Sequence, residues 1–217
     1  MCGRFTLHAP WSELVALYRI HDDRRNLRLR YNIAPTQDVL AVRLDPAGER
    51  EAVDLKWGLL PFWAKDEKIS YSTINARAET VASKPPFRDA FKKRRCLIAA
   101  DGYYEWKPEE GGKQPLRITL DPEQPFSFAG LWEKWERDDR IVESCTIIVT
   151  EANVLTRDIH DRMPVILDPA DYGAWLDGSA GQELLRPYPS ERMRRYPVSK
   201  AVGNVKNTAP ELIEPLV

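Results

Sequence analysis

Short apolar segments of strand length, separated by turn residues, are the feature that most constrains the fold of this chain. The clearest is the continuous apolar run Cys145-Thr-Ile-Ile-Val-Thr150. Similar segments occupy residues 38–44, 52–57, 96–100, 116–120, 126–131 and 165–167. About eight such strands do not alternate regularly with helical patterns, which disfavours a parallel sheet wound with helices. The sequence therefore predicts an α+β fold with a mainly antiparallel β-sheet core.

Only three or four short segments have helical patterns, and they are expected at the periphery of the sheet. Residues 10–18 begin with a proline suited to a first helical turn and place apolar side chains on one face. Residues 87–91 and 169–176 are further candidates. Residues 27–35 are expected to be irregular, and the chain beyond Gly178 is expected to be rich in loops. A turn at 45–48 should join strands 38–44 and 52–57 into a hairpin.

A length of 217 residues suits one domain, and no repeat or low-complexity linker divides it, so we expect a single domain over residues 1–217. The formal net charge of −1 excludes a global positive field, and any binding of nucleic acid must use a local patch. Basic residues gather at 24–30, 92–95 and 192–195. The first and third of these clusters are expected to be solvated faces.

Cysteine and histidine content excludes the common disulfide and zinc frameworks. The three cysteines are widely spaced, and no two of the three histidines have the spacing of zinc ligands. We therefore expect neither a metal nor an organic cofactor. The sequence shows no secretory signal and no apolar stretch long enough for a membrane span, so a cytoplasmic, monomeric protein without a membrane partner is expected.

Cys2 has unusual chemistry if the initiator methionine is removed, as a small second side chain permits. Its free α-amine and its thiol then form a 1,2-aminothiol, with ordinary pKa values of about 8 and about 8.5. The amine condenses with an aldehyde to give an imine, and the thiol closes on the same carbon to give a five-membered thiazolidine. No internal cysteine can do this. The alternative is that Cys2 is an unremarkable residue of a frayed terminus.

Three more candidate reactive side chains, Asn75, Glu105 and His160, are expected at the ends of elements, where catalytic groups often lie. Aromatic neighbours of Glu105 should remove solvent and raise its pKa, which would let it exchange protons near neutral pH. The alternative is an exposed glutamate in a turn. For His160 the alternative is a structural histidine bonded to Asp161 or to backbone. Asn75 alone carries little information.

Arginines accompany three of the four candidates, because Arg4, Arg77 and Arg162 lie within two residues of Cys2, Asn75 and His160. Guanidinium groups match phosphate geometry, so this placement suggests a polyanionic substrate. Tryptophans can stack on unpaired bases, and the candidates are Trp57, Trp63 and Trp106. Core packing is the preferred interpretation for Trp57 and Trp132. Likewise, Cys96 and Cys145 should be inert core residues.

Four separated motifs resemble the signatures of the SRAP family, the SOS-response-associated peptidase domain. They are Met1-Cys-Gly-Arg4, Asn75-Ala-Arg-Ala-Glu-Thr80, Ala100-Asp-Gly-Tyr-Tyr-Glu-Trp106 and Ile159-His-Asp-Arg-Met-Pro164. Weaker similarity continues at 57–59 and 201–207. The resemblance covers nearly the whole chain in order.

The resemblance implies a protein that recognises abasic sites in single-stranded DNA and crosslinks to them through Cys2, in a reversible, lyase-like imine chemistry that shields the lesion. By the same resemblance, Asn75 would orient the Cys2 amine, Glu105 would handle protons, and His160 would assist sugar opening and release. Arg4, Arg77 and Arg162 would hold phosphates. Trp106 and Trp63 would pack on the DNA.

Two other functions remain open at this stage. In a cysteine N-terminal-nucleophile hydrolase, Cys2 would attack an amide with its own α-amine or Glu105 as base, and removal of Met1 would be the minimal reaction. A non-catalytic DNA-binding module is the other alternative. The electrophile discriminates among them, since the aldehyde trap needs the free amine and acts stoichiometrically.

Overall fold

The computed structural model describes residues 2–21 and 24–216. Five strands form a closed small barrel in the order β10-β4-β3-β6-β9, with β9 and β10 also paired. The barrel strands are β3 (Asp38–Leu44), β4 (Arg50–Trp57), β6 (Arg95–Ala100), β9 (Phe126–Arg137) and β10 (Arg140–Glu151). Three short strands extend this sheet: β5 (Asn75–Arg77), β11 (Arg162–Pro164) and β12 (Ile166–Leu167).

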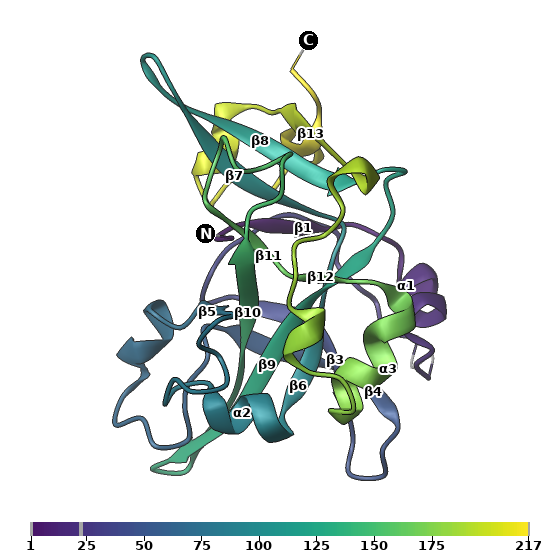
Figure 1. Ribbon diagram of the computed structural model, residues 1–217, viewed down its shortest axis with the longest axis vertical. Helices are drawn as coiled ribbons and strands as arrows, with labels where there is room; N and C mark the ends of the chain where they lie inside the picture. The colour runs from purple at the N-terminus through teal and green to yellow at the C-terminus, as the bar shows by residue number, and fades with distance from the viewer. Residues whose placement is uncertain (1, 22–23, 217) are drawn as a thin grey trace.

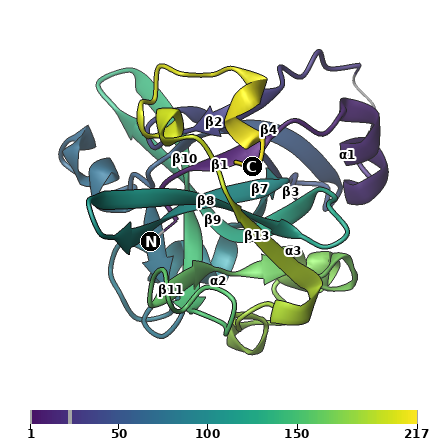
Figure 2. The same ribbon diagram turned by 90° about the horizontal axis from the view of Figure 1, so that it is seen from above.

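A second sheet lies across one end of the barrel, at the top of Figure 1. Its order is β13-β8-β7-β1-β2. The strands are β1 (Phe5–Leu7), β2 (Arg30–Ile33), β7 (Gly102–Glu109), β8 (Gly112–Leu120) and β13 (Met193–Pro197). Figure 2, seen from above, shows β8 and β13 crossing over the barrel strands.

Helices are short and peripheral, as the sequence predicts. The α-helices are α1 (Trp11–Tyr18), α2 (Arg88–Lys93) and α3 (Tyr172–Asp177). The 3₁₀ helices are η1 (Glu67–Tyr71), η2 (Pro169–Asp171), η3 (Gln182–Leu184), η4 (Ser190–Arg192), η5 (Lys200–Gly203) and η6 (Pro210–Ile213). In the described ranges, no helix has the length and apolar character needed to cross a membrane.

The hairpin of β3 and β4 shows how local sequence sets the register. Asp38 lies opposite Lys56 and Leu44 opposite Arg50. At the turn, the Asp45 carboxylate accepts hydrogen bonds from the backbone N–H groups of residues 47 and 49, at 2.8 and 2.9 Å. Gly48 adopts φ +86°, which suits glycine at little steric cost. The predicted hairpin is confirmed.

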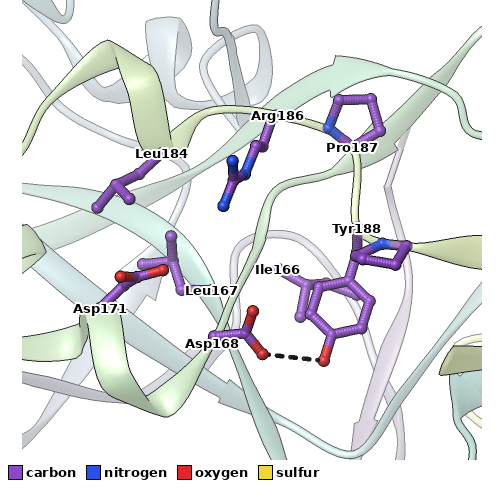
Figure 3. A pocket seen from close by; sticks show the side chains of 9 residues that line it. Ile166, Leu167, Asp168, Asp171, Leu184, Arg186, Pro187 and Tyr188 are labelled. Atoms are coloured by element: carbon purple, nitrogen blue, oxygen red, sulfur yellow. Dashed lines mark hydrogen bonds between the residues drawn. The ribbon is translucent and has the colours of Figure 1, made fainter.

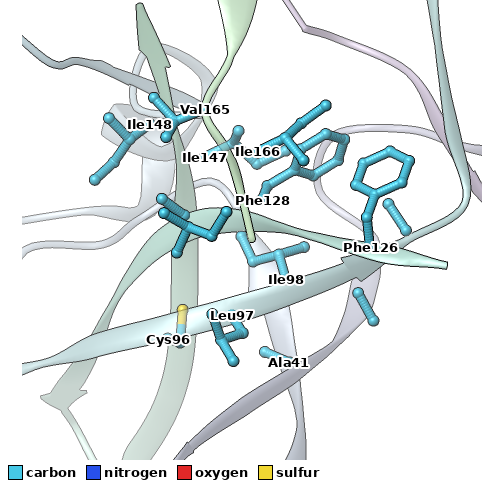
Figure 4. Close-up of a cluster of buried hydrophobic side chains, with 14 of the residues drawn as sticks. Ala41, Cys96, Leu97, Ile98, Phe126, Phe128, Ile147, Ile148, Val165 and Ile166 are labelled. Atoms are coloured by element: carbon cyan, nitrogen blue, oxygen red, sulfur yellow. The ribbon is translucent and has the colours of Figure 1, made fainter. Parts of the chain in front are cut away.

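Side chains of β6, β9 and β10 fill the core (Figure 4). Residues 96–100 of β6 are all fully buried, which explains why their sequence is continuously apolar rather than alternating. Gly130 of β9 lies where a Cβ atom would come within 2.8 Å of Ile98 Cδ1 and 2.9 Å of Cys96 Sγ. The strands are therefore packed closely enough to require glycine at this position.

We expect Gly130→Ala to destabilise the protein by about 1–3 kcal/mol, because its methyl group overpacks the core. Gly203→Ala is the matched control, since a Cβ there meets no atom within 4 Å. Urea unfolding followed by circular dichroism measures both changes. Equal stability of the two variants would contradict this account of the barrel.

The two sheets meet at Phe5, which is fully buried. Its ring contacts Trp57 of the barrel edge-on, with centroids 5.1 Å apart, and Phe128 at 5.6 Å. These aromatic contacts anchor β1 at the junction. Cys2 lies three residues before this anchor, so the fold holds it at the junction as well.

The fold confirms most of the sequence predictions and corrects two of them, at residues 27–35 and at Glu105. Residues 27–35, expected to be irregular, contain β2. Residues 75–77, for which no element was predicted, form β5, and the loop-rich tail beyond Gly178 also contains β13. Glu105 lies inside β7, not at the end of an element, because strand pairing with β8 runs from Tyr103 to Glu109. The sheets are mainly antiparallel, but β10 pairs in parallel with β4 and β5.

Candidate functional site

Cys2 is buried at the sheet junction, and its thiol is free. Its backbone carbonyl accepts a hydrogen bond from Asn75 Nδ2, at 2.9 Å. Asn75 begins β5, which runs parallel to β10 with Asn75 opposite Ile147. The Asn75 side-chain amide is therefore positioned by β5, a strand that the sequence alone did not predict. Burial excludes the alternative of a frayed Cys2.

The other amide atom of Asn75, Oδ1, is buried and accepts no hydrogen bond within residues 2–21 and 24–216. Buried polar atoms are usually paired, so an acceptor left open beside Cys2 is notable. It can accept a hydrogen bond from an amine.

Glu105 comes to the site through the pairing of β7 with the amino-terminal strand. Phe5 lies opposite Tyr103, and the Tyr104 N–H donates to the Arg4 carbonyl at 2.9 Å. The Glu105 side chain is only 6% exposed, so the alternative of an exposed turn glutamate is wrong. Burial raises the pKa of Glu105, while positive charge at the amino terminus and on His160 opposes the rise.

Burial also raises the pKa of the Cys2 thiol, and the negative charge of Glu105 raises it further. The thiol is thus held in its protonated form at neutral pH. Its use as a nucleophile requires a nearby proton acceptor, and the Glu105 carboxyl is close enough to influence its titration.

His160 lies two residues before β11, and its charge influences the titration of Glu105. Its Nδ1 atom lies 2.8 Å from Asp161 Oδ1 and accepts the Arg162 N–H at 2.9 Å. These are the contacts of the structural alternative, and they fix the ring. Nε2 makes no hydrogen bond with any described residue, which leaves that nitrogen open for chemistry.

Arg4 is held by the protein itself. Its Nη1 atom donates to Asn32 Oδ1 and to the Val202 carbonyl, both at 2.7 Å. The guanidinium also lies over the Trp106 ring, 5.7 Å from its centroid. Trp106 is half-buried and packs against the cluster of Tyr104, Val198, Val202 and Leu212.

Asn32 is a residue that sequence reasoning missed. It is 4% exposed, and its amide donates to the carbonyls of Val202, Asn204 and Asn207. It thereby ties the carboxy-terminal segment to Arg4. The weak similarity at 201–207 was the available signal.

Arg77 and Arg162 flank β10 at the edge of the site. Val149 of β10 lies opposite Arg77 on one side, and Glu151 lies opposite Arg162 on the other. Arg77 is exposed. The Arg162 Nη1 atom forms an ion pair with Glu79, a residue of the second motif to which sequence reasoning assigned no role.

Trp63 is 47% exposed in the loop after β4. The neighbouring Ala64 carbonyl accepts a hydrogen bond from Trp135 Nε1 at 2.8 Å, which fixes this loop on the β9–β10 hairpin. No hydrogen bond or ring contact joins Trp63 to Cys2, Glu105 or His160 in the part of the chain described. Its role in DNA packing stays a prediction.

A separate cavity of about 380 Å³ lies beside β12, between Ile166 and Pro189 (Figure 3). The Tyr188 hydroxyl donates to Asp168 Oδ1 there, at 3.3 Å. None of its lining residues belongs to the predicted site. Across the described ranges, no group of three or more His, Cys, Asp or Glu side chains is arranged to hold a metal.

Comparisons with known proteins match nearly the whole chain to one family. Residues 1–205 match the model of the family described as SOS response associated peptidase (SRAP). The chain is 44% identical to the abasic site processing protein YoqW of Bacillus subtilis, covering 99% of each chain. It is 34% identical to the abasic site processing protein YedK of Escherichia coli, covering all of both chains.

A more distant relative and a solved structure extend the match. The abasic site processing protein HMCES of Gallus gallus is 32% identical over all of this chain and 78% of its own length. A crystal structure of a Bacteroides thetaiotaomicron protein is 28% identical and superposes with a TM-score of 0.87, covering both chains fully. The chain belongs to the SOS response associated peptidase family, as its four motifs and its full length indicate.

Proposed function

We propose that this protein processes abasic sites in single-stranded DNA by forming a covalent thiazolidine through Cys2, in a chain from which Met1 has been removed. The observation that carries the proposal is the placement of Cys2. It is buried, fixed through its carbonyl by Asn75, and close enough to Glu105 to feel its charge. The relatives named as abasic site processing proteins support the substrate.

The reaction balances with the loss of one water. A ring-opened abasic sugar presents an aldehyde, and the Cys2 α-amine adds to its carbon to give a carbinolamine. The carbinolamine hydroxyl leaves as water and an imine forms. The thiol then adds to the imine carbon, its proton passes to the imine nitrogen, and the thiazolidine closes.

Glu105 suits the proton transfers of this sequence. Because its pKa is raised, the acid form can protonate the departing hydroxyl, and the carboxylate left behind can accept the thiol proton. The thiol needs such help because its own pKa is raised. Asn75 Oδ1 would accept a hydrogen bond from the α-amine and aim its lone pair at the aldehyde.

His160 would assist opening of the sugar ring and, in reverse, release of the adduct. Its Nδ1 atom accepts the Arg162 backbone N–H, so the open Nε2 is the atom assigned to this exchange. The same motif brings Arg162 to the edge of the site, where Arg77 is also exposed.

Phosphate contacts are assigned to Arg4, Arg77 and Arg162, with Trp106 and Trp63 packing on the DNA. Arg77 is the most available of the three guanidinium groups. Arg162 would share its charge between Glu79 and a phosphate. Arg4 would use the face that remains beside Trp106.

A cysteine hydrolase is the alternative, and removal of Met1 is the reaction to which it applies. For general amide hydrolysis the raised pKa of the Cys2 thiol is unfavourable, because a thiolate is the attacking species.

The test mixes purified protein with single-stranded DNA that contains one abasic site. We expect a band resistant to denaturing electrophoresis, with an intact mass equal to protein lacking Met1 plus DNA minus one water. Cys2→Ala should give no such band. The absence of an adduct from the wild-type protein would refute the proposal, and release of a peptide from amide substrates would favour the hydrolase.

Binding before the covalent step should weaken with salt. Three phosphate contacts to a single strand predict that the logarithm of the binding constant falls by about 2 per tenfold rise in salt. Initial crosslinking rates at low DNA concentration, measured over a salt series, check this. A rate that does not change between low and high salt would contradict the phosphate contacts.

A further inference from the structure

A groove beside helix α2 combines exposed aromatic and basic side chains outside the site described above. Its volume is about 540 Å³. We call it the α2 groove. Its lining includes Phe62, Lys92, Lys93, Arg94, Trp132 and Lys134.

The α2 groove is lined by more basic than acidic side chains. Arg94 pairs with the buried Glu133 at 2.7 Å, and Lys134 pairs with Glu136 at 3.3 Å. Lys92 and Lys93 are exposed and make no hydrogen bond or ion pair with any described residue. Two acidic residues, Asp89 and Glu133, also line the groove. However, Glu133 pairs with Arg94 and Asp89 lies 3.9 Å from Arg88, so Lys92 and Lys93 keep their positive charges without an ion-pair partner among the described residues.

The other basic clusters are different. Arg25 pairs with Asp54 in the first cluster. In the third, Arg192 pairs with Asp168, Arg194 with Glu123 and Arg195 with Asp158. Those four arginines are engaged by the protein's own carboxylates, whereas Lys92 and Lys93 make no ion pair with any described residue.

The aromatic side chains supply flat apolar faces next to these cations. Phe62 is 54% exposed, and the adjacent Trp63 is 47% exposed. Large apolar residues are seldom this exposed next to one another without a binding role. The Trp132 ring is held against the Arg43 guanidinium, 4.1 Å from its centroid, so the wall it forms is rigid.

We propose that the α2 groove binds a segment of single-stranded DNA that continues away from the lesion, with Lys92 and Lys93 on phosphates and a base stacked on Phe62. Stacking platforms beside cationic grooves are the usual means of holding single strands without sequence preference. The choice of DNA rests on the proposed function. In Figure 1, β11 lies beside the upper sheet and α2 near the lower end of the barrel, so a strand that reaches the α2 groove would run along the length of the barrel.

An acidic protein segment would also meet the two lysines. The exposed aromatic pair favours nucleic acid, because bases gain from stacking and carboxylates do not. The two ligands can be separated by experiment, with polyglutamate as the acidic probe.

The test measures fluorescence anisotropy of an undamaged oligothymidylate of about twelve nucleotides, within the usual size of such sites. All proteins carry Cys2→Ala, so only non-covalent binding is seen. Lys92→Gln with Lys93→Gln should reduce the slope of log K against log salt by about 1.4, because two phosphate contacts are lost. Phe62→Ala should weaken binding about tenfold.

Matched controls carry the same changes elsewhere. Arg28→Gln with Lys113→Gln removes two exposed cations outside the groove, and Leu29→Ala removes an exposed apolar side chain. Both should bind as the parent protein does. Thermal unfolding should be unchanged in every variant, since all the altered side chains are exposed.

Three outcomes would overturn the proposal. They are no binding of oligothymidylate by the parent protein, equal salt slopes for the lysine variant and its control, and equally tight binding of polyglutamate that is lost with the same lysines.

Crosslinking separates this inference from the proposed function. With Cys2 present, a four-nucleotide strand carrying one abasic site should react at the same rate in groove variants and parent. Failure of every protein to react would refute the proposed function while leaving the oligothymidylate result to decide on the groove.

Discussion

A chain with one glycine inserted between Met1 and Cys2 is expected to lose abasic-site crosslinking by at least about a thousandfold. The thiol stays in place, but its own α-nitrogen becomes a peptide nitrogen and cannot form an imine. Without an imine, the thiol has no activated carbon on which to close the five-membered ring. The rate advantage of holding the amine and the thiol on one residue is also lost. Cys2→Ala should lose the reaction too, for the complementary reason.

Denaturing electrophoresis with intact mass analysis measures this result. The native chain already has a residue before Cys2, so we expect the inserted chain to fold as the parent does, and circular dichroism serves as the control. An adduct of the inserted chain would show that a thiol alone, or some other amine, captures the aldehyde. The aminothiol account would then be wrong.

Glu105→Gln should slow adduct formation by about 100- to 1000-fold, the range of general acid–base catalysis. The glutamine side chain has nearly the same shape, but it cannot act as a general acid or a general base. Because burial raises the pKa of Glu105, the wild-type rate should rise with pH through a range above that of an ordinary glutamate. The variant should lack this acidic limb. Single-turnover rates over a pH series check both points.

The same substitution should stabilise the fold at neutral pH. A carboxyl group whose pKa is raised by folding favours the folded state at low pH, and that contribution is lost as pH rises through the folded pKa. Glu105→Gln removes this loss, so the gain in stability over wild type should be small near pH 4 and larger near pH 8. Thermal unfolding at the two pH values measures it. A Glu105→Gln variant that forms the adduct faster than wild type would contradict the catalytic role. A variant that is less stable than wild type at pH 8 would show that ionised Glu105 stabilises the fold.

Local patterns predicted most of the fold because they act within a few residues. The hairpin of β3 and β4 follows from alternating side chains and a turn with Asp45 and Gly48. Helix α1 follows from Pro10 and one apolar face. These features need no partner elsewhere in the chain to be recognised.

Elements that depend on distant partners could not be predicted. Strand β13 is stabilised by β8, more than seventy residues earlier in the chain, and β5 by the middle of β10. Closure of the barrel through β9 and β10 is likewise a property of the assembled sheet. Asn32 shows no local signal because its side-chain hydrogen bonds reach Arg4 and residues 202–207, all distant in sequence.

Site residues were identified from chemistry and from separated motifs rather than from spacing. The structure brings Cys2, Asn75, Glu105 and His160 to one junction from four different segments. Their roles stay predictions. Glu79 could not be found from sequence, since nothing in its motif shows that it pairs with an arginine more than eighty residues later.

The anchoring of β1 by Phe5 determines how the protein would resist a force that pulls on attached DNA. In a crosslinked complex the DNA is attached three residues from this anchor, and β1 is hydrogen-bonded on both sides, to β2 and β7. A motor that pulls on the DNA would load these bonds together along the strand rather than peel them one at a time. The attached protein would therefore act as a stiff obstacle on the strand, and clearing it would require unfolding that starts somewhere other than its amino terminus.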